Sequence, residues 1–215
     1  MQNKRKIGYI YIAIGAALII AAALLLKNNI DENTAAGEAS EELLTEVIEQ
    51  MPEVVLEPEV SGPMPAVSVE GRSFVGTVEI PSLGLLLPVQ DQWSNDNAKV
   101  SPCRYKGSAY DNDLIVCGHN YAEHFGTLNE LEMGAEVVFT DMSGRSFYYV
   151  VTNIESLGAY DIEEMEAGEW DLTLFTCTVG GANRVTVRCE ATGKMSETGA
   201  VPDVLEAAKN SHHTR

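Results

Sequence analysis

The chain has 215 residues, of which 45% are hydrophobic, and a formal net charge of −18. This length corresponds to one or two domains, and the acidic balance argues against a nucleic-acid partner, because phosphate binding requires clustered Lys and Arg. The four cysteines, Cys103, Cys117, Cys177 and Cys189, form no CxxC spacing and so do not indicate a zinc ribbon. Their even number leaves disulfide pairing open.

The N-terminus predicts a membrane anchor. Residues 7–26 read IGYIYIAIGAALIIAAALLL and contain no charged side chain. At about 1.5 Å per residue, such a helix spans roughly 30 Å, the thickness of the hydrocarbon core of a bilayer. Lys4, Arg5 and Lys6 precede it, so the positive-inside rule places residues 1–6 in the cytoplasm and the remaining chain outside. The alternative is a cleavable signal peptide, which has a shorter apolar region and a small-x-small cleavage site, whereas this run ends LLLKNN.

Residues 27–71 predict an acidic extracellular stalk. The stretch 31–59 carries acidic residues and no Lys or Arg. Within it, SEELLTEVIEQM predicts a short amphipathic helix with Ser40 as its N-cap. The apolar face of this helix consists of Leu43, Leu44, Val47, Ile48 and Met51. PEVVLEPEVSGPMP then predicts an extended Pro-rich spacer, and a disordered linker is the alternative interpretation.

A domain of short strands follows over residues 72–190, and a polar tail over 191–215. FVGTVEIPSLGLLLPVQ predicts two strands around a Pro-Ser-Leu-Gly turn, and NDLIVCGH predicts a buried strand that ends at His119. AEVVFTDMSGRSFYYVVTNIESL predicts a hairpin that turns at residues 141–144. Helical signals are confined to LNELEMG and part of YDIEEMEAG. Many short strands separated by turns predict an all-β fold, a barrel or a sandwich, with small helical insertions.

The segment DLTLFTCTVGGANRVTVRCE predicts a second hairpin, centred on Gly180 and Gly181. Glycine accepts the positive φ of a two-residue turn, and a turn there places Cys177 opposite Arg184. Directly opposed residues have Cβ atoms roughly 4.5–5.5 Å apart, so a guanidinium comes to lie beside a thiol. The further pairs of this register are Leu174 with Val187, Leu172 with Cys189, Phe175 with Thr186, and Thr173 with Arg188. The first two pairs form an apolar face, and the others share the face of Cys177.

This face carries the groups of nucleophilic catalysis. A cation near the Cys177 thiol favours the thiolate, which is the nucleophilic form. Arg184 can also donate to a substrate carbonyl or to a developing oxyanion. A third group must protonate the leaving amine, and histidine suits this role. His119, at the end of a buried strand, is the predicted candidate, and His124 follows it in a predicted loop.

Structural interpretations of the same residues stand beside this one. A lone cysteine on a strand is usually a small core hydrophobe, and an arginine beside a turn is usually solvated. A metal site built from Cys103, Cys117, His119 and His124 is also conceivable, although their spacings match no common ligand template.

Taken together, these motifs resemble the sortase family. The resemblance rests on TLFTC at residues 173–177, Arg184 after a short loop, and CGHN around His119. FVGTVEIPSLGLLLPV is similar to the strand pair that opens the sortase barrel, and the likeness covers about residues 72–190. The compact TCTVGGANRVTVRCE and the short segment before it resemble a clostridial-type sortase of class B or D, without the long helical insertion typical of class B.

The resemblance implies a closed eight-stranded β-barrel with short helices, preceded by one transmembrane helix. It implies Cys177 as nucleophile, His119 as general acid/base and Arg184 as the oxyanion or substrate-positioning group. Thr176 and Asn120 are expected to line the substrate site. The family's calcium site cannot be matched to acidic residues of this sequence, so we expect neither a metal nor a cofactor.

The implied function is that of a membrane-anchored cysteine transpeptidase on the outer face of a Gram-positive cell membrane. Its partners would be the LPxTG-like sorting signal of a surface protein, cleaved at the threonine carbonyl, and an amine of a peptidoglycan precursor or of a pilin. Slow hydrolysis by water is the fallback reaction. The alternative is a catalytically inactive barrel that binds peptides or serves as a surface scaffold. Other cysteine hydrolases are a more distant alternative, because their nucleophile commonly precedes the histidine in the chain.

Overall fold

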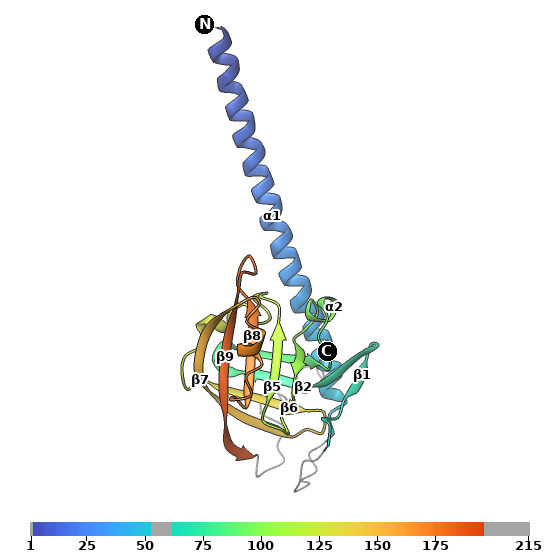
Figure 1. Cartoon of the computed structure of the whole chain (residues 1–215). Coiled ribbons are helices and arrows are strands. Elements are labelled where there is room, and N and C mark those ends of the chain that lie inside the picture. The colour runs from blue at the N-terminus through green and yellow to red at the C-terminus, as the bar shows by residue number, and fades with distance from the viewer. Residues whose placement is uncertain (1, 53–61, 196–215) are drawn as a thin grey trace. The chain divides into compact units, whose positions relative to one another are not determined.

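The computed structural model describes residues 2–52 and 62–195 (Figure 1). Most of the predicted Pro-rich spacer and of the predicted polar tail, residues 53–61 and 196–215, lie outside the described residues. The chain divides into two compact units, Met1–Ala35 and Ala36–Arg215. Helix α1, Gln2–Glu49, contributes residues to both of them.

In the first unit, α1 is a strongly apolar helix. Among the described residues, α1 is the one helix long and apolar enough to cross a membrane, with a mean hydropathy of 2.5 in its most apolar window. The large side chains of this part, from Tyr9 to Ile30, are exposed. This agrees with a single-pass anchor, because exposed apolar side chains along a helix of this length suit the hydrocarbon core of a bilayer.

In the second unit, the last turns of α1 pack on the folded domain. Four members of the predicted apolar face are buried there, Leu43, Val47, Ile48 and Met51, in a cluster with Phe74 and Met142 among others. The predicted face is therefore confirmed, but the predicted N-cap is wrong, because Ser40 lies inside the continuous helix. The preceding Ala- and Glu-rich residues favour helix, so nothing in the chain begins a new helix at Ser40.

Nine strands of the described residues form one sheet, in which β2 pairs with both β3 and β6 and so closes an eight-stranded barrel. Around the barrel the order is β2-β3-β4-β5-β8-β9-β7-β6, and β1 extends β2 outside the ring. The strands are β1 Val67–Val69, β2 Arg72–Ile80, β3 Leu85–Gln90, β4 Cys103–Lys106, β5 Leu114–Gly118, β6 Glu136–Asp141, β7 Ser146–Gly158, β8 Leu172–Cys177 and β9 Asn183–Met195. The short helices are η1 Pro81–Leu83, α2 Asn95–Ala98, η2 Leu128–Glu130 and α3 Ile162–Met165.

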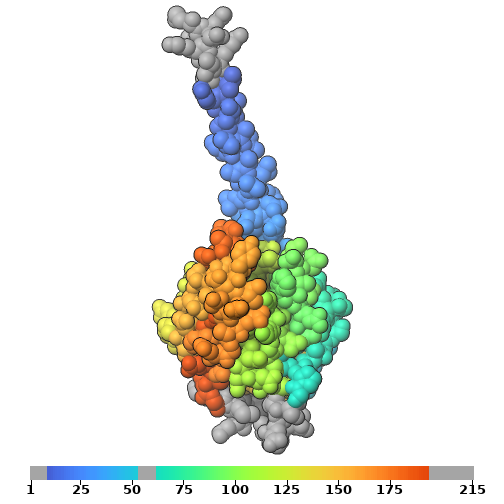
Figure 2. Space-filling model, viewed as in Figure 1, coloured from blue at the N-terminus to red at the C-terminus, as the bar shows by residue number. Residues whose placement is uncertain are grey.

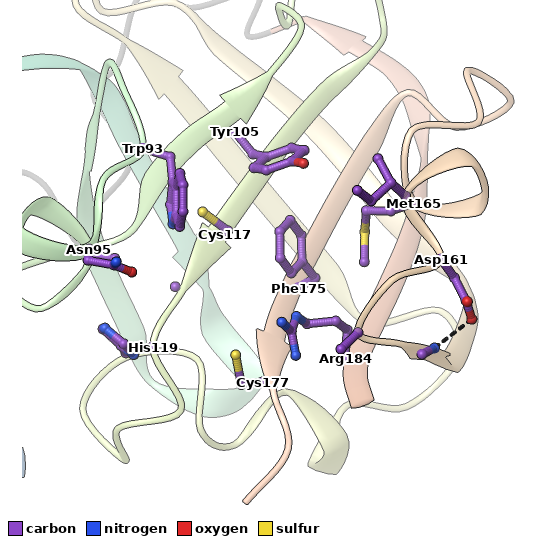
Figure 3. Close-up of a pocket in the computed structure, with 15 residues that line it drawn as sticks. Trp93, Asn95, Tyr105, Cys117, His119, Asp161, Met165, Phe175, Cys177 and Arg184 are labelled. Atoms are coloured by element: carbon purple, nitrogen blue, oxygen red, sulfur yellow. Dashed lines mark hydrogen bonds between the residues drawn. The ribbon is translucent and has the colours of Figure 1, made fainter. Parts of the chain in front are cut away.

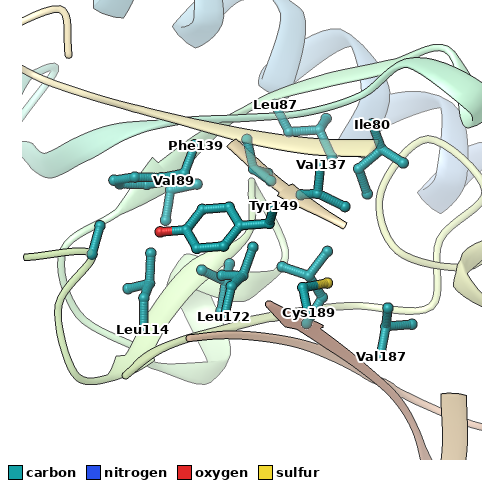
Figure 4. Packing of buried hydrophobic residues seen from close by; sticks show 14 of the residues in the cluster. Ile80, Leu87, Val89, Leu114, Val137, Phe139, Tyr149, Leu172, Val187 and Cys189 are labelled. Carbon is teal, nitrogen blue, oxygen red and sulfur yellow. The ribbon is translucent and has the colours of Figure 1, made fainter. Parts of the chain in front are cut away.

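The barrel interior is a hydrophobic core. Alternate residues of the strands point inward, as the period of two requires. Tyr149 of β7 lies in the middle of this core, beside Val89, Phe139 and Leu172 (Figure 4). Cys189 of β9 is a member of the same cluster and is fully buried. Because its side chain lies in the core, Cys189 cannot contribute a thiol to a site on the outer surface of the barrel.

The predicted strands around η1, the hairpin turning at residues 141–144 and the strand before His119 are all confirmed. The all-β interpretation is confirmed as a closed barrel. Three short elements, β1, α2 and β4, were not predicted from the sequence. Each has only three or four residues, too few for a hydrophobic period to become visible. Two of them, α2 and β4, nevertheless border the candidate site.

Candidate active site

A parallel strand pair brings His119 and Cys177 to the same edge of the barrel. Strands β5 and β8 run side by side (Figure 1), and their register ends with Gly118 opposite Thr176. One residue further along, β5 continues into His119 and β8 ends at Cys177. Figure 2 shows the green and orange segments that contain these strands adjacent on one face of the barrel. Residues far apart in sequence therefore become neighbours through the pairing of two strands.

The antiparallel β8–β9 ladder adds Arg184 to this pair. The register has Cys177 opposite Arg184, Phe175 opposite Thr186 and Leu172 opposite Cys189, as predicted. The loop is wider than the predicted two residues, because the ladder closes at Thr178 and Asn183. Its centre is still Gly180–Gly181, both with positive φ, and a symmetrical widening leaves the register unchanged.

The three side chains line one pocket of about 320 Å³. In Figure 3, Cys177 lies between His119 and Arg184. Three aromatic side chains, Trp93, Tyr105 and Phe175, form the upper part of the pocket. The rings meet edge to face. The ring centroids of Trp93 and Tyr105 are 6.4 Å apart, and those of Tyr105 and Phe175 are 5.4 Å apart. The pocket thus has an apolar wall beside a polar end that holds a thiol, an imidazole and a guanidinium.

The Arg184 guanidinium is held in place by the turn. Its Nη1 donates to the carbonyl of Gly181 at 3.0 Å and to that of Asn183 at 3.1 Å. Both bonds use Nη1, which leaves Nε and Nη2 without a partner among the described residues. An arginine anchored at one end and open at the other can donate to an oxygen that enters the pocket.

His119 is half-buried, and its Nε2 is buried without a hydrogen-bond partner among the described residues. Burial lowers the pKa of its imidazole below the usual 6.5, and the positive charge of Lys99 lowers it further. The ring is therefore neutral at pH 7. A neutral imidazole can accept a proton from a neighbouring thiol and return it later.

The two predicted substrate-binding residues do not line this pocket. Thr176 is 3% exposed, and its hydroxyl donates to the Gly118 carbonyl at 2.9 Å. It ties β8 to β5 immediately before His119 and Cys177, so its contribution is to the position of these two residues. Asn120 is exposed in the loop after His119.

Sequence reasoning missed the residues that form the pocket walls. Trp93 and Tyr105 lie in the segment around α2 and β4, which carried no recognised element. Ile162 and Met165 come from α3, which was predicted as helix but not as part of the site. The aromatic residues were visible in the sequence, but their place depends on the pairing of β4 with β5, which no local pattern predicts.

Helix α3 is held against the barrel by Arg188, whose side chain is fully buried. The guanidinium donates to the carbonyls of Glu164 at 2.6 Å and Met165 at 3.0 Å, at the end of α3. It also donates to Thr173 Oγ1 at 3.0 Å and to Glu155 Oε1 at 2.9 Å. The wall formed by Ile162 and Met165 therefore depends on a single buried cation.

Cys103 and Cys117 oppose each other on β4 and β5, and both are buried, although Cys117 also lines the pocket. Burial raises the pKa of both thiols, that of Cys103 to about 12, so they are poor nucleophiles at neutral pH. All four cysteines are free in the structure. Within the described ranges, no three His, Cys, Asp or Glu side chains gather as they would around a metal ion.

Comparison with known proteins identifies a family for this architecture. The family model described as Sortase domain matches residues 78–192, which is more than half of the chain. The search of curated proteins gave no match.

Solved structures share the fold at low sequence identity. Sortase C from Streptococcus pneumoniae has a TM-score of 0.52 at 19% identity, over 74% of this chain and 90% of its own. A lid mutant of sortase A from Corynebacterium diphtheriae has a TM-score of 0.51 at 16% identity, over 72% of this chain and 94% of its own. Sortase C1 from Streptococcus suis has a TM-score of 0.51 at 23% identity, over 58% of this chain and 75% of its own. These likenesses establish a common barrel.

Proposed function

The chain belongs to the sortase family of transpeptidases, and we propose that it cleaves an LPxTG-like sorting signal and transfers the acyl part to an amine. The proposal places α1 as a single-pass membrane anchor with residues 1–6 in the cytoplasm. The catalytic barrel, residues 72–190 of the sequence prediction, then works on the outer face. The observation that carries the proposal is the meeting of Cys177, His119 and Arg184 in one pocket.

The first half of the reaction forms an acyl-enzyme. Neutral His119 takes the proton of the Cys177 thiol, and the thiolate attacks the threonine carbonyl of the sorting signal. The carbonyl oxygen becomes an oxyanion, to which the free N–H groups of Arg184 donate. When the intermediate collapses, the C–N bond breaks, and the His119 imidazolium gives its proton to the leaving amine. The product is a thioester on Cys177.

The second half reverses these roles. An amine of a peptidoglycan precursor, or of a pilin, gives up a proton to His119 and attacks the thioester carbonyl. The C–S bond breaks, and the sulfur recovers its proton from the imidazolium. Water in place of the amine gives slow hydrolysis. The apolar wall of Trp93, Tyr105 and Phe175 suits the apolar side chains of such a signal.

The test uses the full chain in detergent micelles and a library of peptides built around Leu-Pro-x-Thr-Gly, with and without an added amine. We expect cleavage after threonine, amine-dependent transfer, and loss of both reactions in Cys177→Ala. Retained turnover in folded Cys177→Ala would exclude Cys177 as nucleophile. Absence of both turnover and thiol labelling in the wild-type chain would favour the inactive, peptide-binding barrel.

A further inference from the structure

The end of α1 packs directly on the loop that follows β5 and carries His119. His124 in this loop is fully buried, and its Nε2 lies 3.3 Å from the carbonyl oxygen of Ala36. A carbonyl only accepts, so the neutral imidazole carries its proton on Nε2. At the next position of α1, a Cβ on Gly37 would lie 2.8 Å from Cγ of Glu123, so the helix and the loop are in close contact here.

A row of three rings leads from this contact to the pocket. The rings of His124 and Tyr121 have centroids 5.6 Å apart, and those of Tyr121 and His119 are 5.0 Å apart with an interplanar angle of 34°. Tyr121 therefore packs between the buried histidine at α1 and the histidine in the pocket. His124 is fully buried, so its ring has little free volume in which to move, and a displacement of this ring is passed on to Tyr121.

The backbone makes the loop a stiff unit. The Phe125 N–H donates to the His119 carbonyl at 3.2 Å, and the Gly126 N–H donates to the Tyr121 carbonyl at 2.9 Å. The ring of Phe125 is fully buried and lies so close to Gly118 that a Cβ there would be 2.8 Å from it. The loop thus folds back on the end of β5, and the position of its middle fixes the position of His119.

We propose that Tyr121 and His124 are positioning residues for His119, and that residues 36–49 of α1 brace them as a structural part of the catalytic site. The inference rests on the proposed function only in taking His119 as the acid/base. It moves the start of the catalytic unit from the predicted residue 72 to the last turns of α1. The segment that the sequence indicated as a stalk then has a second role, because it holds a catalytic group in place.

The first experiment perturbs the helix without touching the pocket. Gly37→Leu in the full chain, in detergent micelles, places a large side chain in the contact between α1 and Glu123, while Glu38→Leu adds the same side chain on the exposed side of the helix. The readout is the titration of the His119 imidazole by NMR in histidine-labelled protein, assigned with His119→Gln. We expect the pKa of His119 to rise toward 6.5 in Gly37→Leu, because the loosened ring gains solvent, and to stay at the wild-type value in Glu38→Leu.

The second experiment perturbs the row of rings. Tyr121→Leu removes the ring and Tyr121→Phe keeps it. We expect Tyr121→Leu to raise the pKa of His119 and to lower kcat for sorting-signal cleavage roughly ten- to hundredfold with little change in KM, as a misplaced catalytic group does. We expect Tyr121→Phe to restore both values. If Gly37→Leu does not fold, the Tyr121 pair decides the question.

An unchanged His119 titration in both Gly37→Leu and Tyr121→Leu would overturn the proposal. The titration does not require turnover, so it separates this inference from the proposed function. A wild-type chain that cleaves no peptide disproves the function, while the effect of Gly37→Leu on His119 still decides whether α1 positions that residue.

Discussion

Cys177 and Arg184 are directly opposed across the β8–β9 ladder, and the carbonyls of the intervening turn fix the guanidinium of Arg184. The turn therefore has two tasks. It sets the register that places cation and thiol on one face, and it supplies the acceptors that orient the cation. Nε and Nη2 have no partner within residues 2–52 and 62–195, so under the proposed function they can donate to a substrate oxygen, and the planar shape of arginine then matters as much as its charge.

The first prediction concerns Arg184→Lys. Lysine keeps the charge but cannot bind the turn carbonyls and a substrate oxygen through one rigid plane. We expect kcat to fall roughly 10²-fold, as for removal of one oxyanion donor, with little change in melting temperature. Single-turnover kinetics of peptide cleavage provide the measurement. Wild-type kcat in Arg184→Lys would contradict a role in stabilising the oxyanion.

The second prediction concerns the buried Arg188. Its removal leaves the carbonyls of Glu164 and Met165 and the Glu155 carboxylate without their donor. A buried polar group left without its hydrogen-bond partner costs about 1–3 kcal/mol, so we expect Arg188→Ala to unfold at lower denaturant concentration. Arg188→Lys should recover part of the stability and raise KM, because α3 loosens. Glu155→Gln is the matched control, and we expect a smaller effect because the Glu155 side chain is 34% exposed.

The hairpin could be predicted from sequence because its information is local. Alternation of Leu172 and Leu174 with Thr173 and Phe175 fixes the faces, and the two glycines fix the centre. The structure has a wider loop, but the same centre preserves each predicted pair. A hairpin register thus tolerates an error in turn type as long as the loop widens on both sides equally.

The approach of His119 to Cys177 rests on different information. It requires that β5 and β8 pair in parallel, and the chain between them holds two further barrel strands. No periodicity near either residue encodes that pairing, so the sequence predicted His119 as the acid/base only from its residue type and its place at the end of a buried strand. The resemblance to a family then supported the same role. Trp93 and Tyr105 were not predicted as pocket residues for the same reason, since their place in the pocket depends on which strands pair with β4.

The third prediction concerns the pH dependence of stability. Burial lowers the pKa of His124 from 6.5 to about 4, and the positive charge of a protonated His119 acts in the same direction. Since the unfolded chain binds the proton first, the contribution of His124 is fully present above pH 6.5 and is lost as the pH falls toward 4. The shift corresponds to about 3 kcal/mol in total.

The measurement compares wild type with His124→Gln, which can still donate to the Ala36 carbonyl but does not titrate. Carboxylates titrate equally in both proteins, so the difference in unfolding free energy isolates the histidine. We expect the advantage of the wild type at pH 7 to shrink steadily between pH 6.5 and 4. Two parallel stability profiles over this range would show that His124 does not titrate in this way.

The last prediction asks whether the end of α1 is part of the folded barrel. Ile48 is 2% exposed and packs in the cluster that contains Phe74 and Met142, whereas the adjacent Glu49 is exposed. Truncation of a buried isoleucine to alanine costs about 2–5 kcal/mol, through lost transfer energy and the cavity left behind. We therefore expect Ile48→Ala to lower the unfolding midpoint of the barrel, followed by tryptophan fluorescence, and Glu49→Ala to leave it unchanged. If α1 were only a spacer, the two variants would unfold together with the wild type, because a side chain on a free stalk contributes nothing to the barrel.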